Sequence, residues 1–303
     1  MLKLYKSVDS EGDTIPTHPI QLSLSVDAKS SRHDAPGTLT AGLAGEGDRG
    51  GLLVVNADDW GRDHETTEST AQCVGAGTVS AVSAMVFMPD SERAASLARE
   101  RGIDAGLHLN FTMPFSAPDC PRRLLERQRE LVAYLRRHSL ARVVFHPGLT
   151  GSFEYVVKAQ LDEFSRLYGA APDRIDGHHH MHLCANVLAG RLLPVGTMVR
   201  PNFSFRPGEK SLANRLYRKA VDRRLRRRHR LVDFLFSLVP LDQPGRLEAI
   251  FSLARTSTVE VETHPINPDE YRFLLGDEFL RLTASVRIGR ASAITGPAVP
   301  GPK

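Results

Sequence analysis

The sequence places acidic and imidazole side chains directly after several short apolar runs. Asp58 and Asp59 follow the run LLVV at residues 52–55, and His108 and Asn110 lie in the run DAGLHLNF. A single Asp or His at such a place is usually a capping or core residue. Ionisable side chains that converge in a buried place without a function would each carry a large desolvation cost. We therefore interpret the recurrence of this pattern as a catalytic site.

Two further groups repeat the pattern later in the chain. The run RID ends at Asp176 and is followed by HHHMH, and the run VEVET is followed by His264. Four imidazoles cannot all bind one ion, and an extended strand would place His178, His180 and His182 on one face. Histidine tracts that store metal usually lie in disordered tails, not after a strand. His264 is interpreted either as a packing residue or as a general acid.

The chemistry that these residue types support is metal-assisted hydrolysis. One carboxylate with two imidazoles leaves coordination positions open for water, which is typical of catalytic metal sites. Asp58 and Asp59 cannot point the same way on an extended strand, but at a strand-to-loop corner both can line one pocket. One of them would then bind a divalent cation while the other takes a proton from water; the alternative is that one caps the following helix. A redox iron site would use the same ligand set, so these residues do not fix the metal; we expect one divalent ion, Mg or Zn.

The elements that position these side chains alternate between short apolar runs and helical patterns. Strands are predicted at residues 52–55, 79–87, 104–111, 174–183, 198–200 and 259–264, and helices at residues 65–75, 91–101 and 153–168. Residues 141–146 are predicted to open a strand or to end a helix. Strands separated by helices indicate a parallel sheet in a barrel or a doubly wound α/β layer. Both architectures place their sites at the carboxyl ends of the strands.

By length, one large globular domain with tails is as plausible as two domains. The chain has 303 residues, 41% of them hydrophobic and 24% charged, which excludes global disorder. Loose composition predicts a leader over residues 1–50 and a tail over 286–303. No apolar stretch resembles a membrane span or a secretory signal, so a cytoplasmic protein is expected. The cysteines, which are few and scattered, support neither a disulfide framework nor a thiolate zinc site.

Positive charge is concentrated in one segment, predicted as a basic helix over residues 211–230. Residues 215–230 carry nine Lys or Arg against one Asp. The segment is interpreted either as a solvated helix face or as a patch for a peripheral anionic surface. Because Tyr217 is the only aromatic residue in it, no specific nucleic-acid partner is expected.

Four blocks of the sequence resemble the signature blocks of the YdjC-like (ChbG-type) carbohydrate deacetylases, in the same order and with matching spacing. The blocks are NADDWG (56–61), GLHLNFT (106–112), DGHHHMH (176–182) and THPINPDEY (263–271). The resemblance covers about residues 51–285. It implies a TIM-like (β/α) barrel with fewer than eight strands, one divalent metal, and removal of the N-acetyl group from an acetylated amino sugar such as a chitooligosaccharide.

The resemblance also assigns roles to individual residues. It makes Asp59, His108 and His178 metal ligands, Asp58 the catalytic base and His264 the acid. The residues expected to contact the substrate or support the ligands are Arg200, His180, His182, Asn110 and Trp60. For Arg200 the alternatives are a substrate contact and the orientation of Asp58. Trp60 stands where the family usually has Phe, and HPIN replaces the commoner HPG, so the sugar itself is left open.

A different class of function is kept as the alternative. The chain would then be a catalytically idle barrel, tethered to an anionic surface or polymer by its Arg-rich helix, with a metal that only stabilises the fold. The intact pair of Asp58 and Asp59 beside His264 argues against this, because a structural metal site does not need it. A homo-oligomer is compatible with either reading.

Overall fold

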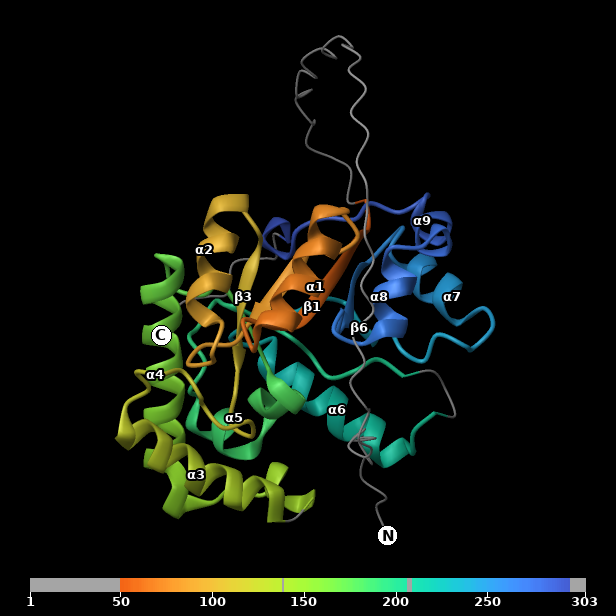
Figure 1. Ribbon diagram of the computed structural model, residues 1–303. Coiled ribbons are helices and arrows are strands. Elements are labelled where there is room, and N and C mark those ends of the chain that lie inside the picture. The colour runs from red at the N-terminus through yellow and green to blue at the C-terminus, as the bar shows by residue number, and fades with distance from the viewer. Residues whose placement is uncertain (1–49, 138, 206–208, 295–303) are drawn as a thin grey trace, which may run out of the picture. The chain divides into compact units, whose positions relative to one another are not determined.

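The computed structural model describes residues 50–137, 139–205 and 209–294 (Figure 1). These residues form a seven-stranded sheet in the order β5-β4-β3-β2-β1-β7-β6, in which every neighbouring pair is parallel. The strands are β1 (Leu52–Trp60), β2 (Ala81–Ala84), β3 (Ala105–Leu109), β4 (Arg174–Gly177), β5 (Met198–Val199), β6 (Phe234–Ser237) and β7 (Thr258–Thr263). The α/β class and the strand number below eight are confirmed.

The sheet curls into a half-barrel whose two edges approach each other. β5 and β6 form no ladder, but the backbone N–H of Val199 donates to the carbonyl of Arg230 at 2.8 Å. Further along, the N–H of Ser204 donates to the carbonyl of Leu235 at 2.8 Å. Parallel strands need crossover connections, and these run mostly through helices on the outside of the sheet.

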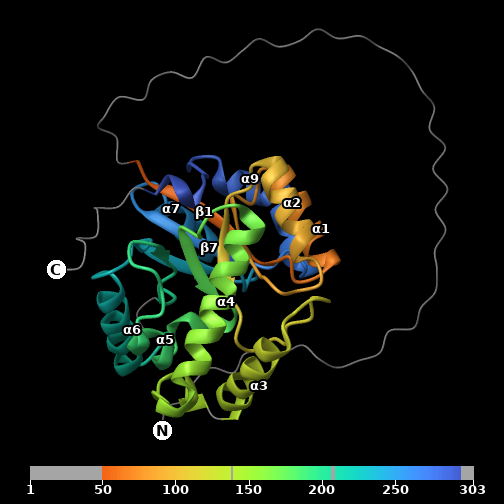
Figure 2. The same ribbon diagram turned by 90° about the vertical axis from the view of Figure 1, so that its left-hand side faces the viewer.

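The helices cover the outer face of the curled sheet (Figures 1 and 2). They are α1 (His64–Gly75), α2 (Ser91–Arg101), α3 (Arg122–Arg137), α4 (Thr150–Tyr168), α5 (Ala185–Gly190), α6 (Leu212–Leu225), α7 (Arg246–Leu253), α8 (Pro268–Leu274) and α9 (Asp277–Thr283). α4 contacts both α2 and α3. None of the helices in the described ranges has the length and apolar character of a membrane span.

Alternation along β1 divides the interior into an apolar part and a polar part. Leu53, Val55 and Ala57 belong to the large core between sheet and helices. The opposite face of the strand carries Leu52 and Val54, which pack in a smaller apolar cluster, and then Asn56 and Asp58. Because successive side chains alternate, the inner face changes from apolar to polar toward the carboxyl end of the strand. Candidate functional side chains therefore gather at that end.

Several predicted boundaries differ from the structure. The strand predicted over 79–87 is limited to Ala81–Ala84, and Phe87 has a left-handed backbone (φ +60°) that is incompatible with a continuing strand. Residues 141–146 form no strand; the 3₁₀ helix η1 (Ser139–Arg142) precedes exposed Val144 and Phe145. The helices α3, α5, α7, α8 and α9 and the strand β6 were not predicted.

The predicted tail begins inside the folded domain. The backbone N–H of Leu53 donates to the carbonyl of Arg287 at 2.9 Å, and the N–H of Gly289 donates to the carbonyl of Leu53 at 3.0 Å. Residues 286–294 therefore continue the packing beside β1, and the boundary at 285 is placed too early. The predicted leader, apart from Gly50, lies outside the described residues, as does the rest of the tail.

Candidate metal and catalytic site

The two adjacent aspartates face the same region because the backbone turns a corner between them. Asp59 has φ +64°, in the left-handed region, and the pairing of β1 with β2 shifts register between Ala57 and Trp60. A positive φ is unfavourable for a residue with a Cβ, so the surroundings must hold it. Both carboxylates are buried, with Asp58 3% and Asp59 2% exposed. Because of this corner the two side chains share one environment, whereas a regular strand would point them to opposite faces.

Three donors from different strand ends meet at Asp59. Its Oδ1 is 3.0 Å from Nδ1 of His178 and 3.4 Å from Nε2 of His108. One ligand atom from each of the three residues lies within 4.8 Å of the other two. His108 is on β3 and His178 follows β4, so the parallel order of the strands brings both imidazoles to the same edge. The sequence-predicted ligand set is thus together in space.

His108 is held by a second carboxylate behind it. Its Nδ1 is 2.8 Å from Oδ1 of Asp176, the residue directly opposite it in the β3–β4 register. A carboxylate on the far nitrogen is the usual way in which a metal-binding imidazole is oriented. Burial lowers the pKa of His108, but the nearby charge of Asp58 and the hydrogen bonds with Asp176 and Asp59 outweigh it and raise the pKa to about 10. The carboxylates around His108 therefore favour positive charge at this place.

The interior around this cluster carries more buried carboxylates than buried arginines. The carboxylates are Asp58, Asp59, Asp176, Glu260 and Glu262, and the arginines are Arg174 and Arg200. Burial acts to raise the pKa of Asp59, yet hydrogen bonds from the two histidines hold it well below its usual range, which favours the ionised carboxylate. One carboxylate and two imidazoles in a region of excess negative charge fit a divalent cation.

Arg200, which follows β5, binds Asp58 through both of its terminal nitrogens. Nη1 lies 2.7 Å from Oδ2 of Asp58, and Nη2 lies 2.7 Å from Oδ1. The same guanidinium contacts Asp176 at 3.0 Å, Glu260 at 2.8 Å and Glu262 at 3.1 Å. Of the two alternatives for Arg200, the geometry favours the orientation of Asp58, because the guanidinium is buried and fully engaged.

His264 completes a second cluster with Asp58 and Glu262, in which one atom of each lies within 4.8 Å of the others. Glu270 accepts hydrogen bonds from the backbone N–H of His264 at 3.0 Å and from Oγ1 of Thr263 at 2.8 Å, which fixes the end of β7. Burial lowers the pKa of His264, but the charges of Asp58 and Glu262 outweigh it and raise the pKa. The carboxylates around His264 therefore favour the protonated form of its imidazole.

The histidine-rich segment is a turn and not the predicted strand. After Gly177 the chain enters the 3₁₀ segment η3 (His178–Leu183), in which His179 and His180 have φ of +54° and +55°. The three alternate histidines therefore do not share a face. Nε2 of His180 lies 3.2 Å from Oε2 of Glu262, and Nε2 of His182 lies 2.9 Å from the carbonyl oxygen of Arg200.

Three of the residues expected to face the substrate are enclosed by protein. Trp60 is fully buried, and its indole N–H donates to the carbonyl of Ala94 at 3.2 Å. Asn110 is fully buried and bonds the backbone of Met113 through both ends of its amide. His182 is fully buried, and burial lowers its pKa to about 3. Their contacts are those of core and loop-supporting residues, so a substrate contact by them is not proposed again.

Some members of the site received no role in the sequence analysis. Asp176 and Glu262 carry the signal of a polar residue at or near a strand end, but their function depends on which strands are neighbours. Glu260 lies deeper on β7, opposite Val54, and gave no such signal. Arg62 lies 3.0 Å from Oδ2 of Asp59 through Nη1 and stands in a turn whose geometry no local motif indicates.

Fold and site together define a parallel α/β half-barrel with a buried Asp-His-His centre at the carboxyl ends of its strands. The family model for YdjC-like proteins matches residues 52–282. The chain therefore belongs to the YdjC-like family. This confirms the family indicated by the four sequence blocks.

Curated relatives are carbohydrate deacetylases. The chain is 33% identical over 132 residues to a chitooligosaccharide deacetylase of Proteus mirabilis, covering 44% of this chain and 50% of that one. It is 34% identical over 142 residues to a carbohydrate deacetylase of Mus musculus, covering 45% of this chain and 44% of that one. The matches thus span about half the length of these relatives.

A solved structure supports the fold independently. A protein of Enterococcus faecalis, described provisionally as a cellobiose-phosphate cleavage protein, superposes with a TM-score of 0.55 at 19% identity. The match covers 80% of this chain and 98% of the other. At this identity the likeness concerns the architecture alone.

Proposed function

We propose that the protein is a metal-dependent hydrolase that removes the N-acetyl group from an acetylated amino sugar or oligosaccharide. The observation that carries the proposal is the convergence of Asp59, His108 and His178 beside Asp58. The curated relatives are carbohydrate deacetylases, which supports the same reaction class.

Asp59, His108 and His178 would hold the cation, and Mg or Zn is the expected metal. When bound, the ion supplies Lewis acidity, which lowers the pKa of a water molecule and polarises the acetamide carbonyl. Asp176 fixes the ring of His108 and thereby its donor nitrogen. With these three residues as ligands, Asp58 is not needed to bind the metal.

Asp58 acts as the general base, taking a proton from the attacking water. Two hydrogen bonds from Arg200 and one of 2.7 Å from Nδ2 of Asn56 orient its carboxylate. The guanidinium of Arg200 also places a positive charge beside this carboxylate. A base that is oriented in advance spends little free energy on reorganisation during the reaction.

His264 acts as the general acid, giving its proton to the nitrogen of the leaving amino sugar. It is adjacent to Asp58 and Glu262, and it remains partly accessible at the end of β7. The water supplies hydroxide to the acetyl carbon and a proton to Asp58, the C–N bond breaks, and the amine takes the proton of His264. The products are acetate and a free amino sugar.

The direct test is acetate release from a panel of N-acetylated mono- and oligosaccharides. Metal-stripped protein is compared with protein restored with Mg or Zn. Release that depends on the metal supports the proposal. Failure with every metal and every sugar would overturn it and favour the idle barrel tethered by its Arg-rich helix.

Variants separate the two roles of the aspartates. Asp58→Asn should keep the metal and lower kcat by about 10²–10⁴-fold, whereas His178→Ala should lower metal affinity first. Asp162→Asn is the matched control, since Asp162 pairs with Lys158 on the surface of α4. Near-normal turnover of Asp58→Asn would place the base elsewhere, and unchanged metal content of His178→Ala would remove His178 from the ligand set.

A further inference from the structure

A cavity outside the proposed active site lies between α5 and the end of α6. Its volume is about 250 Å³. It is lined by Val187, Leu188, Arg191, Leu193, Arg224, Leu225, Arg227, Arg228 and His229. α5 and α6 lie side by side in both views (Figures 1 and 2). The lining therefore joins residues 187–193 with residues 224–229 of the chain.

The cavity has a positive rim and an apolar floor. Its four arginines have no acidic counterpart among the lining residues. No hydrogen bond or ion pair of the described residues joins the side chains of Arg191, Arg224, Arg227 or Arg228 to a carboxylate. Val187, Leu193 and Leu225 form the buried floor, and His229 is only 6% exposed. Four like charges gathered without compensation repel each other unless an anion joins them.

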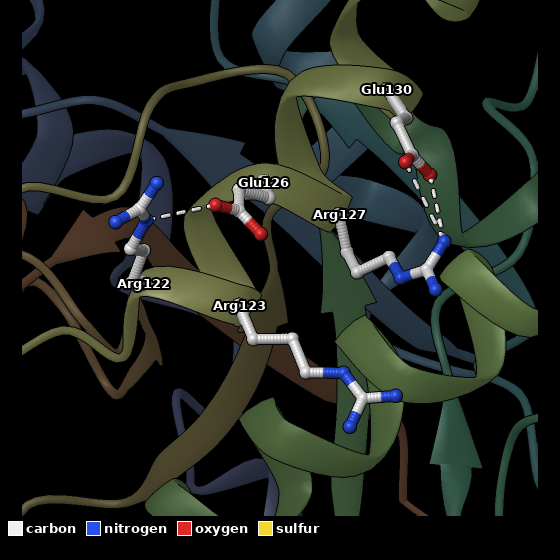
Figure 3. A pocket seen from close by; sticks show the side chains of 5 residues that line it. All are labelled: Arg122, Arg123, Glu126, Arg127 and Glu130. Atoms are coloured by element: carbon white, nitrogen blue, oxygen red, sulfur yellow. Dashed lines mark hydrogen bonds and ion pairs between the residues drawn. The ribbon is translucent and has the colours of Figure 1, made fainter.

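Two of the three arginines that line a second hollow, on α3, pair with carboxylates, unlike the arginines of this cavity. On α3, Arg122 bonds Glu126 at 2.9 Å and Arg127 contacts Glu130 at 3.2 Å (Figure 3). Arg123 of the same group lies over the ring of Tyr155. The α3 group also lines a hollow, but three arginines share it with two glutamates. It therefore offers no comparable excess of charge.

The cavity adjoins the residues that precede and begin β5, whereas the proposed catalytic residues lie at the carboxyl ends of the strands. Nδ1 of His229 lies 3.4 Å from Oγ1 of Thr197, which precedes β5, and Arg230 pairs with Met198 at the start of that strand. The candidate ligands and Asp58 instead lie at the carboxyl ends of the strands. A molecule in the cavity would therefore not be the substrate in the act of reaction.

We propose that this cavity is a binding site for a phosphate group carried by a small polyanion. The guanidinium fork matches the oxygens of phosphate and can donate two parallel hydrogen bonds to it. A volume below that of ordinary drug-sized pockets suits one compact anionic group and excludes a long chain from the cavity itself. The phosphate belongs either to a soluble compound or to a lipid headgroup, and the chemistry recognised is the same.

The test measures binding of tripolyphosphate to the full chain by calorimetry. The triple variant Arg224→Ala, Arg227→Ala, Arg228→Ala should weaken the affinity by at least about tenfold. The matched control is Arg122→Ala, Arg123→Ala, Arg127→Ala on α3, which should leave it within about twofold. Circular dichroism and thermal unfolding check that both proteins fold, and the single variant Arg224→Glu repeats the test with less change to the helix end.

Vesicles of phosphatidylcholine and phosphatidic acid in equal parts distinguish the two sources. If tripolyphosphate displaces the protein from the vesicles, the site is assigned to a lipid headgroup. If tripolyphosphate binds and the vesicles do not, the site is assigned to a soluble compound. Both outcomes support the cavity as a phosphate-binding site. Absence of tripolyphosphate binding at low salt overturns the proposal, as does equal loss in the two triple variants. These measurements do not use deacetylation, so their outcome is independent of the proposed reaction.

Discussion

Arg200 and Asp58, which are 142 residues apart in the chain, form a buried pair in which both carboxylate oxygens receive a hydrogen bond at 2.7 Å. The pair joins the ends of β5 and β1 across the curled sheet. It also links the candidate site to the deeper carboxylate of Glu260, which Nε of Arg200 reaches at 2.8 Å. The guanidinium of Arg200 therefore both orients Asp58 and balances the negative charge of the neighbouring carboxylates.

Replacement of Arg200 by Met should destabilise the fold strongly, because it leaves Asp58, Asp176 and both neighbouring glutamates without their shared cation. Breaking a buried pair by removing one partner typically lowers the free energy of unfolding by about 3–5 kcal/mol. Urea unfolding followed by circular dichroism measures the loss. Arg166→Met is the control, since Arg166 pairs with Glu163 on the exposed face of α4 and should change stability by less than about 1 kcal/mol. Equal effects of the two variants would contradict the importance of the buried pair.

Addition of a divalent metal should stabilise the protein, because the cation binds a site that the unfolded chain does not assemble. At a concentration of 100 times Kd the gain is about 2.7 kcal/mol, which shifts Tm by about 5–10 °C. Differential scanning calorimetry with and without Zn or Mg measures the shift. Asp59→Asn and His178→Ala should abolish it, while Asp58→Asn should retain it. A shift that persists in Asp59→Asn would place the ion elsewhere.

The parallel α/β architecture could be predicted because apolar runs and helical patterns alternate along the chain. The edge strand β6 could not, since it has four residues and no polar residue that signals a site. The amphipathic spacing of Leu124, Leu131 and Leu135 in α3 was present in the sequence and was overlooked. Short elements with weak patterns depend on tertiary contacts for their existence.

The candidate site could be located from the residues at strand ends, but the sequence alone does not show which of these residues contact one another. His108 and Asp176 face each other only because β3 and β4 are neighbours in register, 68 residues apart in the chain. Period-two alternation predicted that His178 and His180 share a face, whereas the left-handed backbone at His180 separates them. A positive φ at histidine has no sequence signal comparable to glycine.

Turnover should depend on pH through His264. Burial lowers its pKa, but the charges of Asp58 and Glu262 raise it above the ordinary value of 6.5. The protonated acid therefore persists above pH 6.5, and activity should fall only as the pH rises through the raised pKa. Glu262→Gln removes one of the charges and should move this alkaline limb to lower pH. The same raised pKa gives a stability contribution that is complete below pH 6.5 and is lost as the pH rises.

The measurement is the pH profile of kcat for wild type and Glu262→Gln at saturating metal. His264→Gln should be much less active and should lack the limb assigned to the imidazole. An identical limb in the wild type and both variants would assign it to another group. The comparison of Glu262→Gln with the exposed variant Glu154→Gln controls for the general effect of removing an acidic charge.

Trp60, the single tryptophan of the chain, should report on the core and not on the substrate. Because its indole is fully buried and bonds Ala94, its fluorescence should be blue-shifted and should stay unchanged when an acetylated sugar is added. Trp60→Ala should lower the free energy of unfolding by about 3–5 kcal/mol through the cavity it leaves. Trp60→Phe introduces the residue that is common in the family and should recover most of that loss. The metal affinity of this variant should stay within about twofold of wild type. A substrate-dependent change in Trp60 emission, or a raised KM for Trp60→Phe at unchanged stability, would place the indole in the substrate pocket.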